Sequence, residues 1–342
     1  MNDFDPKGIG IPNGNFLGLP YSADDSKILL LQVPWDVTTS YRPGTSKGPK
    51  AIIDASIQLD LFDFNLEKAW ENKIATLPED PSIVLLNNKM RSLAEEIMEQ
   101  LANGADEEDP EIQQKTELIN QASTEVNAFV YDSAKNWLEK GAIVGVIGGE
   151  HSVPLGLLKA LSEVHQGYGI LHIDAHADLR EAYEGFTYSH ASIMNNALKL
   201  SHINKLVQVG IRDLCQDEVN SAEFDERIIM FSDFLLSQKE FKGQTWADTC
   251  TEIISHLPRK VYVSFDIDGL TPDNCPNTGT PVPGGLTYKQ AQYLLKCLTE
   301  SDRKIIGFDL CEVAPGENNE WDANVGARIL RQLCNFTAVS HQ

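Results

Sequence analysis

The chain lacks any long hydrophobic run and is poor in positive charge. None of its 342 residues fall in an uninterrupted apolar stretch of the roughly 18–20 residues that a membrane-spanning helix needs. Only 28 lysines and arginines stand against 50 aspartates and glutamates, which gives a net charge of −22. Because nucleic acids and anionic membranes are bound through basic patches, this balance argues against both as partners. It favours a small cationic substrate instead.

The sequence also lacks closely paired cysteines and an N-terminal stretch with the features of a secretion signal. The six cysteines are scattered and form no Cys-x-x-Cys pair, so we expect reduced thiols rather than a disulfide framework or a zinc site. Residues 1–10 are polar and acidic, without the basic and apolar regions of a secretion signal. We therefore expect a cytoplasmic protein. Cys311 is expected to be a buried packing residue.

Strand-like and helix-like segments alternate along most of the chain. Apolar runs predict strands at 27–33, 142–147, 168–173, 205–211, 227–231, 260–265 and 304–310. Helices are expected at 51–57, 155–161, 287–298 and 322–333, and Thr287 and Gln290 have capping-box spacing. Such alternation is typical of parallel strands joined by crossover helices. We predict one three-layer α/β domain that spans residues 1–342.

Residues 66–140 follow a different pattern. Apolar residues recur at helical spacing from Leu86 to Leu101 and again from Leu118 to Phe129, and each series ends at a glycine. An acidic break at 106–110 separates the two series. We expect an acidic helical insertion at about 66–140, which serves packing or oligomer contacts rather than chemistry.

Metal-competent side chains follow the strand at 168–173. Asp174, His176 and Asp178 are spaced by two, and in extended backbone such residues point to the same side. Taken alone, this pattern also fits a single-metal site or a polar strand end at a solvated edge. His172, inside the strand, is expected to pack or to support the site from behind.

Three further strand ends carry similar side chains. They are His151 after the strand at 142–147, Asp266 and Asp268 after 260–265, and Glu312 after 304–310. In a parallel sheet all carboxyl ends lie at one edge, where ligands bind. We therefore expect these side chains to meet.

Four carboxylates that meet in one place need cations. Asp174, Asp178, Asp266 and Asp268 could not all stay ionised together, because like charges raise each other's pKa. Two divalent ions would match the four negative charges, and His151 and His176 would complete the ligand set. Carboxylate-rich ligation with imidazole favours manganese, with iron, nickel, cobalt and zinc as alternatives. Two such ions about 3.5–4 Å apart would hold a bridging water with a much lowered pKa.

At this point the sequence resembles the ureohydrolase family of arginases and agmatinases. The matching segments are Gly-Gly-Glu-His-Ser at 148–152, Asp-Ala-His-Ala-Asp at 174–178, Gly-Ile-Arg at 210–212, Ser-Phe-Asp-Ile-Asp-Gly-Leu at 264–270, Thr-Gly-Thr-Pro-Val-Pro-Gly-Gly-Leu-Thr at 278–287 and Glu-Val-Ala-Pro at 312–315. The resemblance covers most of residues 27–335 apart from the insertion. It implies the three-layer arginase fold with a parallel sheet of about eight strands. It also implies two Mn²⁺ ions per subunit, with Ni²⁺ or another divalent metal as the alternative, and a homo-oligomer, trimeric or hexameric.

The resemblance also implies roles for individual residues. His151 and Asp178 would bind one metal ion, His176 and Asp268 the other, and Asp174 and Asp266 would bridge them. A metal-bridging hydroxide would attack the guanidinium carbon of the substrate, giving urea and an amine. Among the catalytic residues, Glu312 would pair with the substrate cation, Asp178 would pass a proton to the departing amine, and His190 would assist proton transfer.

The resemblance leaves the substrate open. Residues 179–190 are similar to the agmatinase version of this loop and lack the arginase pattern, which favours agmatine over arginine. The insertion at 66–140 and residues 317–321 depart from ordinary agmatinases, so guanidinobutyrate, another guanidino acid and guanidine itself stay as alternatives. Formimidoylglutamate is disfavoured by the residue before His151. An inactive, metal-binding regulatory homologue is the alternative from outside the enzymes.

Overall fold

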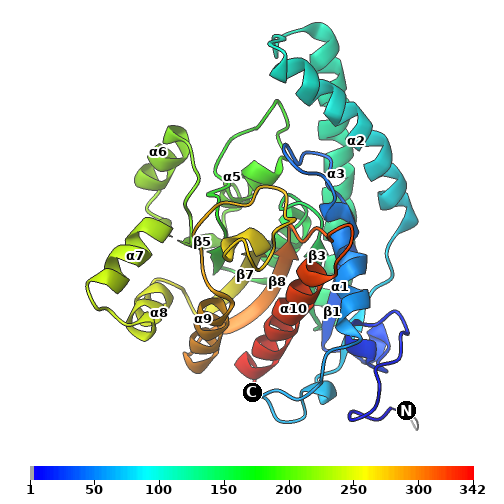
Figure 1. Cartoon of the computed structure of the whole chain (residues 1–342), viewed down its shortest axis with the longest axis vertical. Helices are drawn as coiled ribbons and strands as arrows, with labels where there is room; N and C mark the ends of the chain where they lie inside the picture. Colours follow the sequence, from blue (N-terminus) through cyan, green and yellow to red (C-terminus); the bar gives the residue numbers. More distant parts are fainter. Residues whose placement is uncertain (1–3) are drawn as a thin grey trace.

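A single parallel sheet organises the chain, in a computed structural model that describes residues 4–342. Its eight strands lie in the order β2-β1-β3-β8-β7-β4-β5-β6, and every neighbouring pair is parallel. The strands are β1 (Ile28–Val33), β2 (Ile74–Thr76), β3 (Ile143–Gly148), β4 (Tyr168–Ile173), β5 (Ile203–Val209), β6 (Ile228–Phe231), β7 (Lys260–Asp266) and β8 (Lys304–Cys311). The predicted parallel α/β sheet is thereby confirmed (Figure 1).

The pattern of apolar runs missed one strand. β2 has only three residues, too few to show a period, and it pairs with β1 at the edge of the sheet. It lies inside the stretch at 66–140 for which we expected only helix. That stretch therefore begins as part of the sheet and becomes helical from Pro81 onward.

Ten α-helices accompany the strands within residues 4–342. They are α1 (Gly48–Ser56), α2 (Pro81–Ala102), α3 (Pro110–Glu139), α4 (Leu155–Val164), α5 (Ile193–Leu198), α6 (Gln216–Phe224), α7 (Asp233–Phe241), α8 (Trp246–Ser255), α9 (Tyr288–Glu300) and α10 (Trp321–Ser340). The predicted capping box of α9 is present, since Thr287 and Gln290 each bond the other's backbone N–H. None of the helices in the described part of the chain is long and apolar enough to cross a membrane.

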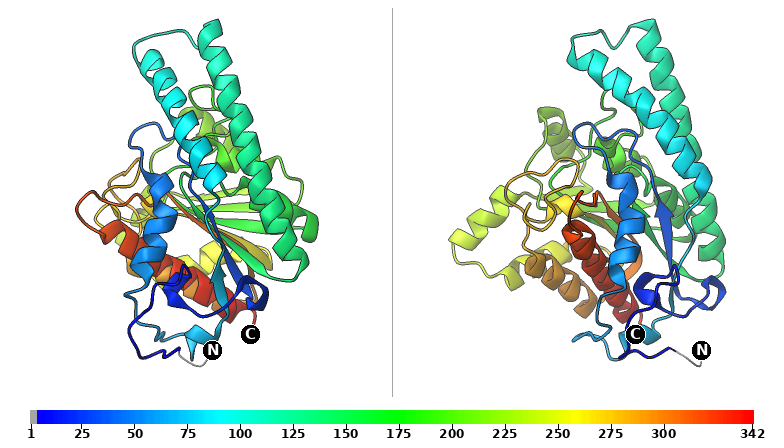
Figure 2. Two further views of the ribbon diagram at one scale, coloured as in Figure 1. Left: turned by 90° about the vertical axis from the view of Figure 1, so that its right-hand side faces the viewer. Right: turned by 45° about the vertical axis from the view of Figure 1, so that its right-hand side comes forward.

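Two hydrophobic cores lie on opposite faces of the sheet. Successive residues of a strand point to opposite faces, so in β1 Ile28 and Leu30 enter one core while Leu31 and Val33 enter the other. Helices α1, α8, α9 and α10 cover the first face, and α3, α4 and α5 cover the second. Figure 2 shows α1 and α10 on one side of the sheet and α3 on the other. This is the predicted three-layer architecture.

Helices α2 and α3 form a long antiparallel hairpin. Figure 2 shows it rising well beyond the sheet, with α3 the inner helix and α2 packed along it. Both helices begin with an aspartate cap and a proline, Asp80-Pro81 and Asp109-Pro110. The acidic break between them is exposed at the tip of the hairpin, as the charge of its residues requires.

Candidate metal centre

The predicted ligands come from four adjacent strands at the centre of the sheet. β3, β8, β7 and β4 are consecutive in the strand order, and their carboxyl ends lead to His151, to Glu312, to Asp266 and Asp268, and to the segment 174–178. Segments more than a hundred residues apart in sequence therefore deliver side chains to one place. The six residues predicted as ligands lie together there, as expected from the strand ends.

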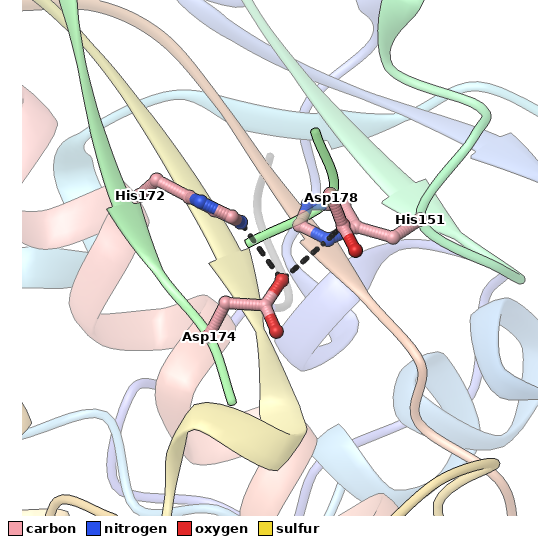
Figure 3. Close-up of side chains that lie close together, drawn as sticks. All are labelled: His151, His172, Asp174 and Asp178. Atoms are coloured by element: carbon pink, nitrogen blue, oxygen red, sulfur yellow. Dashed lines mark hydrogen bonds and ion pairs between the residues drawn. The ribbon is translucent and has the colours of Figure 1, made fainter. Parts of the chain in front are cut away.

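The two histidines face different sets of carboxylates. His151 Nδ1 lies 2.9 Å from Asp174 Oδ2, 3.2 Å from Asp178 Oδ2 and 3.3 Å from Asp266 Oδ2. His176 Nδ1 lies 3.1 Å from Asp268 Oδ2 and 3.5 Å from Asp174 Oδ1. Asp174 thus offers one oxygen to each histidine. Figure 3 shows Asp174 between His172 and His151, with Asp178 beside them. The contacts group Asp178 with His151 and Asp268 with His176, as the family resemblance implies, and they place Asp266 with His151. The bridging role of Asp266 and ligation itself stay predictions.

The donor set fits divalent cations. The carboxylates of Asp174, Asp178, Asp266 and Asp268 are all at least 95% buried. Asp268 Oδ2 accepts no hydrogen bond of regular geometry, although His176 Nδ1 lies 3.1 Å from it. Burial, and then the charge of Asp174, raise the pKa of Asp178 to about 6. Burial, followed by the charges of Asp268 and Asp174, raises the pKa of Asp266 well above its ordinary value. Such crowding of buried negative charge is relieved by bound cations.

The histidines respond to the same field. Burial alone would lower the pKa of His176, but Asp268 and Asp174 raise it to about 12. Burial would also lower the pKa of His151, but the surrounding carboxylates raise it well above its ordinary value. The imidazoles of His172, His151 and His176 overcome the effect of burial on Asp174 and hold its pKa well below the usual range. The cluster therefore favours bound positive charge, whether as protons or as metal ions.

A buried polar row crosses the sheet directly behind the ligands. Gln208 on β5, His172 on β4, Ser264 on β7 and Asp309 on β8 are register neighbours on successive strands. All four are buried. Of these, only His172 was expected to support the site. The signal in the sequence was a polar residue within an apolar strand, as at Gln208 and Asp309.

This polar row orients the ligands. Ser264 Oγ donates to Asp309 Oδ2 at 2.8 Å, so it accepts the Nε2–H of His151 at 2.9 Å. That leaves His151 Nδ1 directed at the carboxylates. On the other side, His172 Nε2 donates to Asp174 Oδ2 at 2.8 Å, while Gln208 Nε2 donates to His172 Nδ1 at 3.0 Å. Residues that orient metal ligands in this way commonly tune metal affinity.

Removing the hydroxyl of Ser264 should therefore weaken metal binding without removing a ligand. In Ser264→Ala the Nε2–H of His151 loses its acceptor at 2.9 Å and keeps only the more distant Asp309 Oδ1 at 3.5 Å. We therefore expect metal affinity to fall about ten- to a hundredfold. Titration calorimetry with Mn²⁺ on metal-free protein would measure the change. Ser201→Ala, at an exposed serine, is the matched control. Equal affinity in Ser264→Ala and wild type would show that the polar row does not orient the ligand.

Two site residues have left-handed backbone. Asp178 has φ 56° and Glu312 has φ 63°, a region that non-glycine residues seldom adopt. Such conformations persist where the surrounding structure imposes them, often at functional sites. Glu312 is 4% exposed, and its Oε1 accepts the backbone N–H of His151 at 2.8 Å. This hydrogen bond holds the Glu312 carboxylate, which is predicted to bind substrate, next to the predicted metal ligand His151.

His190 lies beside the cluster on the loop that follows β4. Its backbone N–H donates to Thr38 Oγ1 at 3.0 Å, and Thr38 Oγ1 donates to Glu150 Oε1 at 2.9 Å. Burial, and then the nearby His176, lower the pKa of His190 to about 3, which makes this imidazole neutral near pH 7. Thr38 and Glu150 were not predicted as site residues. Glu150 directly precedes His151, and its full burial was the missing information.

A cavity of about 300 Å³ opens onto this cluster. His176, Asp178 and His190 are among the residues that line it. Tyr41, Tyr183 and the exposed carboxylate of Asp213 also line it. Glu312 does not line the cavity; it is buried, and its Oε2 lies close to Gly279, the neighbour of the lining residue Thr280. The predicted proton-transfer residues therefore face the cavity, whereas the predicted substrate carboxylate is buried beside it.

Comparison with known proteins agrees with this fold. The model of the arginase family matches residues 26–335. The N(1)-aminopropylagmatine ureohydrolase of Thermus thermophilus is 30% identical over 311 residues, which are 91% of this chain and 89% of that protein. The agmatinase of Halalkalibacterium halodurans is 30% identical over 312 residues, covering 91% and 92% of the two chains.

Solved structures share the fold at lower identity. The agmatine ureohydrolase of Thermoplasma volcanium aligns with a TM-score of 0.74 at 23% identity, over 97% of this chain and 96% of that one. The arginase of Medicago truncatula aligns with a TM-score of 0.63 at 23% identity, over 91% and 87% of the chains. With the matching family model over nearly its whole length, the chain belongs to the arginase family.

Proposed function

We propose that this protein hydrolyses a guanidino compound with a cationic tail, such as agmatine, to urea and an amine, with two Mn²⁺ ions as cofactors. The observation that carries the proposal is the convergence of two histidines and four buried carboxylates in one cluster, of which His176 and Asp178 line a cavity. Relatives named agmatinase and N(1)-aminopropylagmatine ureohydrolase support it.

The reaction adds one water across a carbon–nitrogen bond. The oxygen of water joins the guanidinium carbon, the bond to the substituted nitrogen breaks, and the departing nitrogen takes a proton. Divalent ions held by the six ligands would neutralise the carboxylates and lower the pKa of that water. Asp178 and His190 face the cavity and are placed to hold or pass the proton. Glu312, buried next to His151 and Gly279, is the carboxylate that would pair with the guanidinium.

The outer part of the cavity favours a positive rather than a negative tail. Asp213 presents an exposed carboxylate there, and Glu218 also lines the wall. The one arginine of the wall, Arg180, has its Nε 3.7 Å from Glu218 Oε2 and lies over the ring of Tyr183. The positive charge of Arg180 is therefore already paired with Glu218. A carboxylate tail, as in guanidinobutyrate or arginine, would meet mostly negative charge.

A urea assay on a guanidino panel tests the proposal. Wild-type protein loaded with Mn²⁺, and in parallel with Ni²⁺, would be given agmatine, aminopropylagmatine, guanidinobutyrate, arginine and guanidine. We expect urea, with the highest kcat/KM for a substrate with a cationic tail. If urea formed only from guanidinobutyrate or guanidine, that compound would be the substrate in place of agmatine. No urea from any member, in protein that holds its metal, would refute the hydrolase and favour a non-catalytic metal-binding protein.

A further inference from the structure

Two loops form the outer wall of the cavity, and both are held by the α2–α3 hairpin. The first loop comprises residues 36–41, after β1, and contributes Ser40 and Tyr41 to the wall. The second loop comprises residues 183–190 and contributes Tyr183 and His190. Neither loop belongs to a strand of the sheet. Their positions therefore depend on contacts other than the hydrogen bonds of the sheet.

Helix α2 holds the first loop through two side chains. Arg91 Nη1 donates to three backbone carbonyls, of Asp36 at 3.1 Å, Val37 at 3.2 Å and Thr39 at 2.6 Å. One turn earlier, Asn87 Oδ1 accepts the N–H of Asp36 at 2.7 Å. Asn87 Nδ2 also donates to Asp36 Oδ1 at 3.0 Å. A guanidinium on three carbonyls fixes the curvature of the loop, because each bond constrains a different peptide group.

Helix α3 holds the second loop through Asn120. Its Nδ2 donates to the carbonyl of Gly185 at 3.2 Å, and its Oδ1 accepts the N–H of Thr187 at 2.9 Å. These two bonds fasten the middle of the loop, between Tyr183 and His190. The Asn120 amide therefore gives this loop one donor and one acceptor, as a neighbouring strand would.

The two loops meet at His190. Thr38, in the first loop, accepts the backbone N–H of His190 in the second at 3.0 Å. A shift of either loop would therefore displace His190 as well as the tyrosines. Figure 2 shows the hairpin as an antiparallel pair of helices reaching past the carboxyl edge of the sheet, which is where these loops lie.

We infer that the α2–α3 hairpin is a brace that sets the width of the substrate cavity, with Arg91 and Asn120 as positioning residues that determine substrate affinity and selectivity. This inference rests on the proposed function and gives the stretch at 66–140 a role beyond packing. Misplacing a wall residue by about 1 Å can cost as much as a hundredfold in rate. The brace contacts no metal ligand, so its loss should leave the metal centre intact.

Two variants, one on each helix, test the brace in the full, Mn²⁺-loaded chain. Arg91→Ala releases the first loop, and Asn120→Ala releases the second. Lys89→Ala and Gln121→Ala remove exposed side chains from the same helices and serve as controls, the former with the same loss of charge. We expect faster hydrogen–deuterium exchange in residues 36–41 or 183–190, respectively. We also expect at least a fivefold rise in KM, with two metal ions still bound per chain.

The outcomes separate the brace from the function. If the loops of Arg91→Ala and Asn120→Ala exchange hydrogen for deuterium as slowly as in wild type, or if KM stays within twofold of wild type, the inference is overturned. The same rise of KM in the control variants would overturn it too. If wild-type protein forms no urea from any guanidino compound, the proposed function fails. The exchange comparison would then decide the brace alone, with faster exchange in its favour and unchanged exchange against it.

Discussion

Replacing Asp174 with alanine should leave the protein unable to hold metal. Asp174 is the one carboxylate whose two oxygens face both His151 and His176, at 2.9 Å and 3.5 Å. Its removal would take a ligand from both predicted metal positions at once. We expect metal content below a tenth of an ion per chain after dialysis, measured by plasma mass spectrometry. We expect kcat/KM to fall on the order of 10³-fold or more, since the metal supplies several kcal/mol to such reactions.

Controls separate loss of metal from loss of fold. Asp174→Asn keeps the size of the side chain and one acceptor for the backbone N–H of His176, a bond of 2.6 Å in the native site. It should retain the circular dichroism of the wild type and still bind little metal. Asp302→Ala, at an exposed turn, should behave as wild type. Normal metal content in both Asp174 variants would remove this residue from the metal centre.

Replacing Glu312 with glutamine should impair substrate binding and leave the metal in place. Glutamine preserves the shape and can still accept the N–H of His151, which Glu312 Oε1 accepts at 2.8 Å. What it removes is the negative charge that would pair with a guanidinium. Losing one partner of a buried, hydrogen-bonded charge pair costs about 3–4 kcal/mol. We therefore expect kcat/KM to fall about 10²- to 10³-fold.

The depth of Glu312 makes this variant informative. Because Glu312 is buried and does not line the cavity, its role requires that the guanidinium reach beyond the cavity lining. Glu223→Gln, at an exposed site on α6, is the control for loss of charge. Kinetics with the best substrate, together with metal analysis, would report the result. Wild-type kcat/KM in Glu312→Gln would show that another group binds the guanidinium.

Local patterns in the sequence were sufficient for much of the site. Asp174, His176 and Asp178 follow an apolar strand at a spacing of two, and so do Asp266 and Asp268. The spacing identified the candidate ligands, although Asp178 has left-handed backbone and Asp268 lies in a short 3-10 helix (Ile267–Gly269) rather than in extended chain. That parallel strands end at one edge was enough to predict that these segments meet.

Other features depended on contacts between distant segments. The row of Gln208, His172, Ser264 and Asp309 exists only because β5, β4, β7 and β8 are adjacent in matching register. The order of these strands has no local signature. The hydrogen bond between Thr38 and His190, across 152 residues, is likewise invisible in either loop. The short strand β2 and helices α5–α8 were missed because short elements are specified largely by what they pack against.

The sequence by itself therefore determined the class of fold and which polar side chains meet at the carboxyl edge of the sheet, because strand ends and the polar residues that follow them can be read from local patterns. The tertiary structure alone decided how the ligands are oriented, how deep Glu312 lies and what holds the cavity walls. Those properties come from Ser264 and Asp309 behind His151, and from Arg91 and Asn120 on the hairpin. Each depends on hydrogen bonds between segments that only the packed sheet and helices bring together.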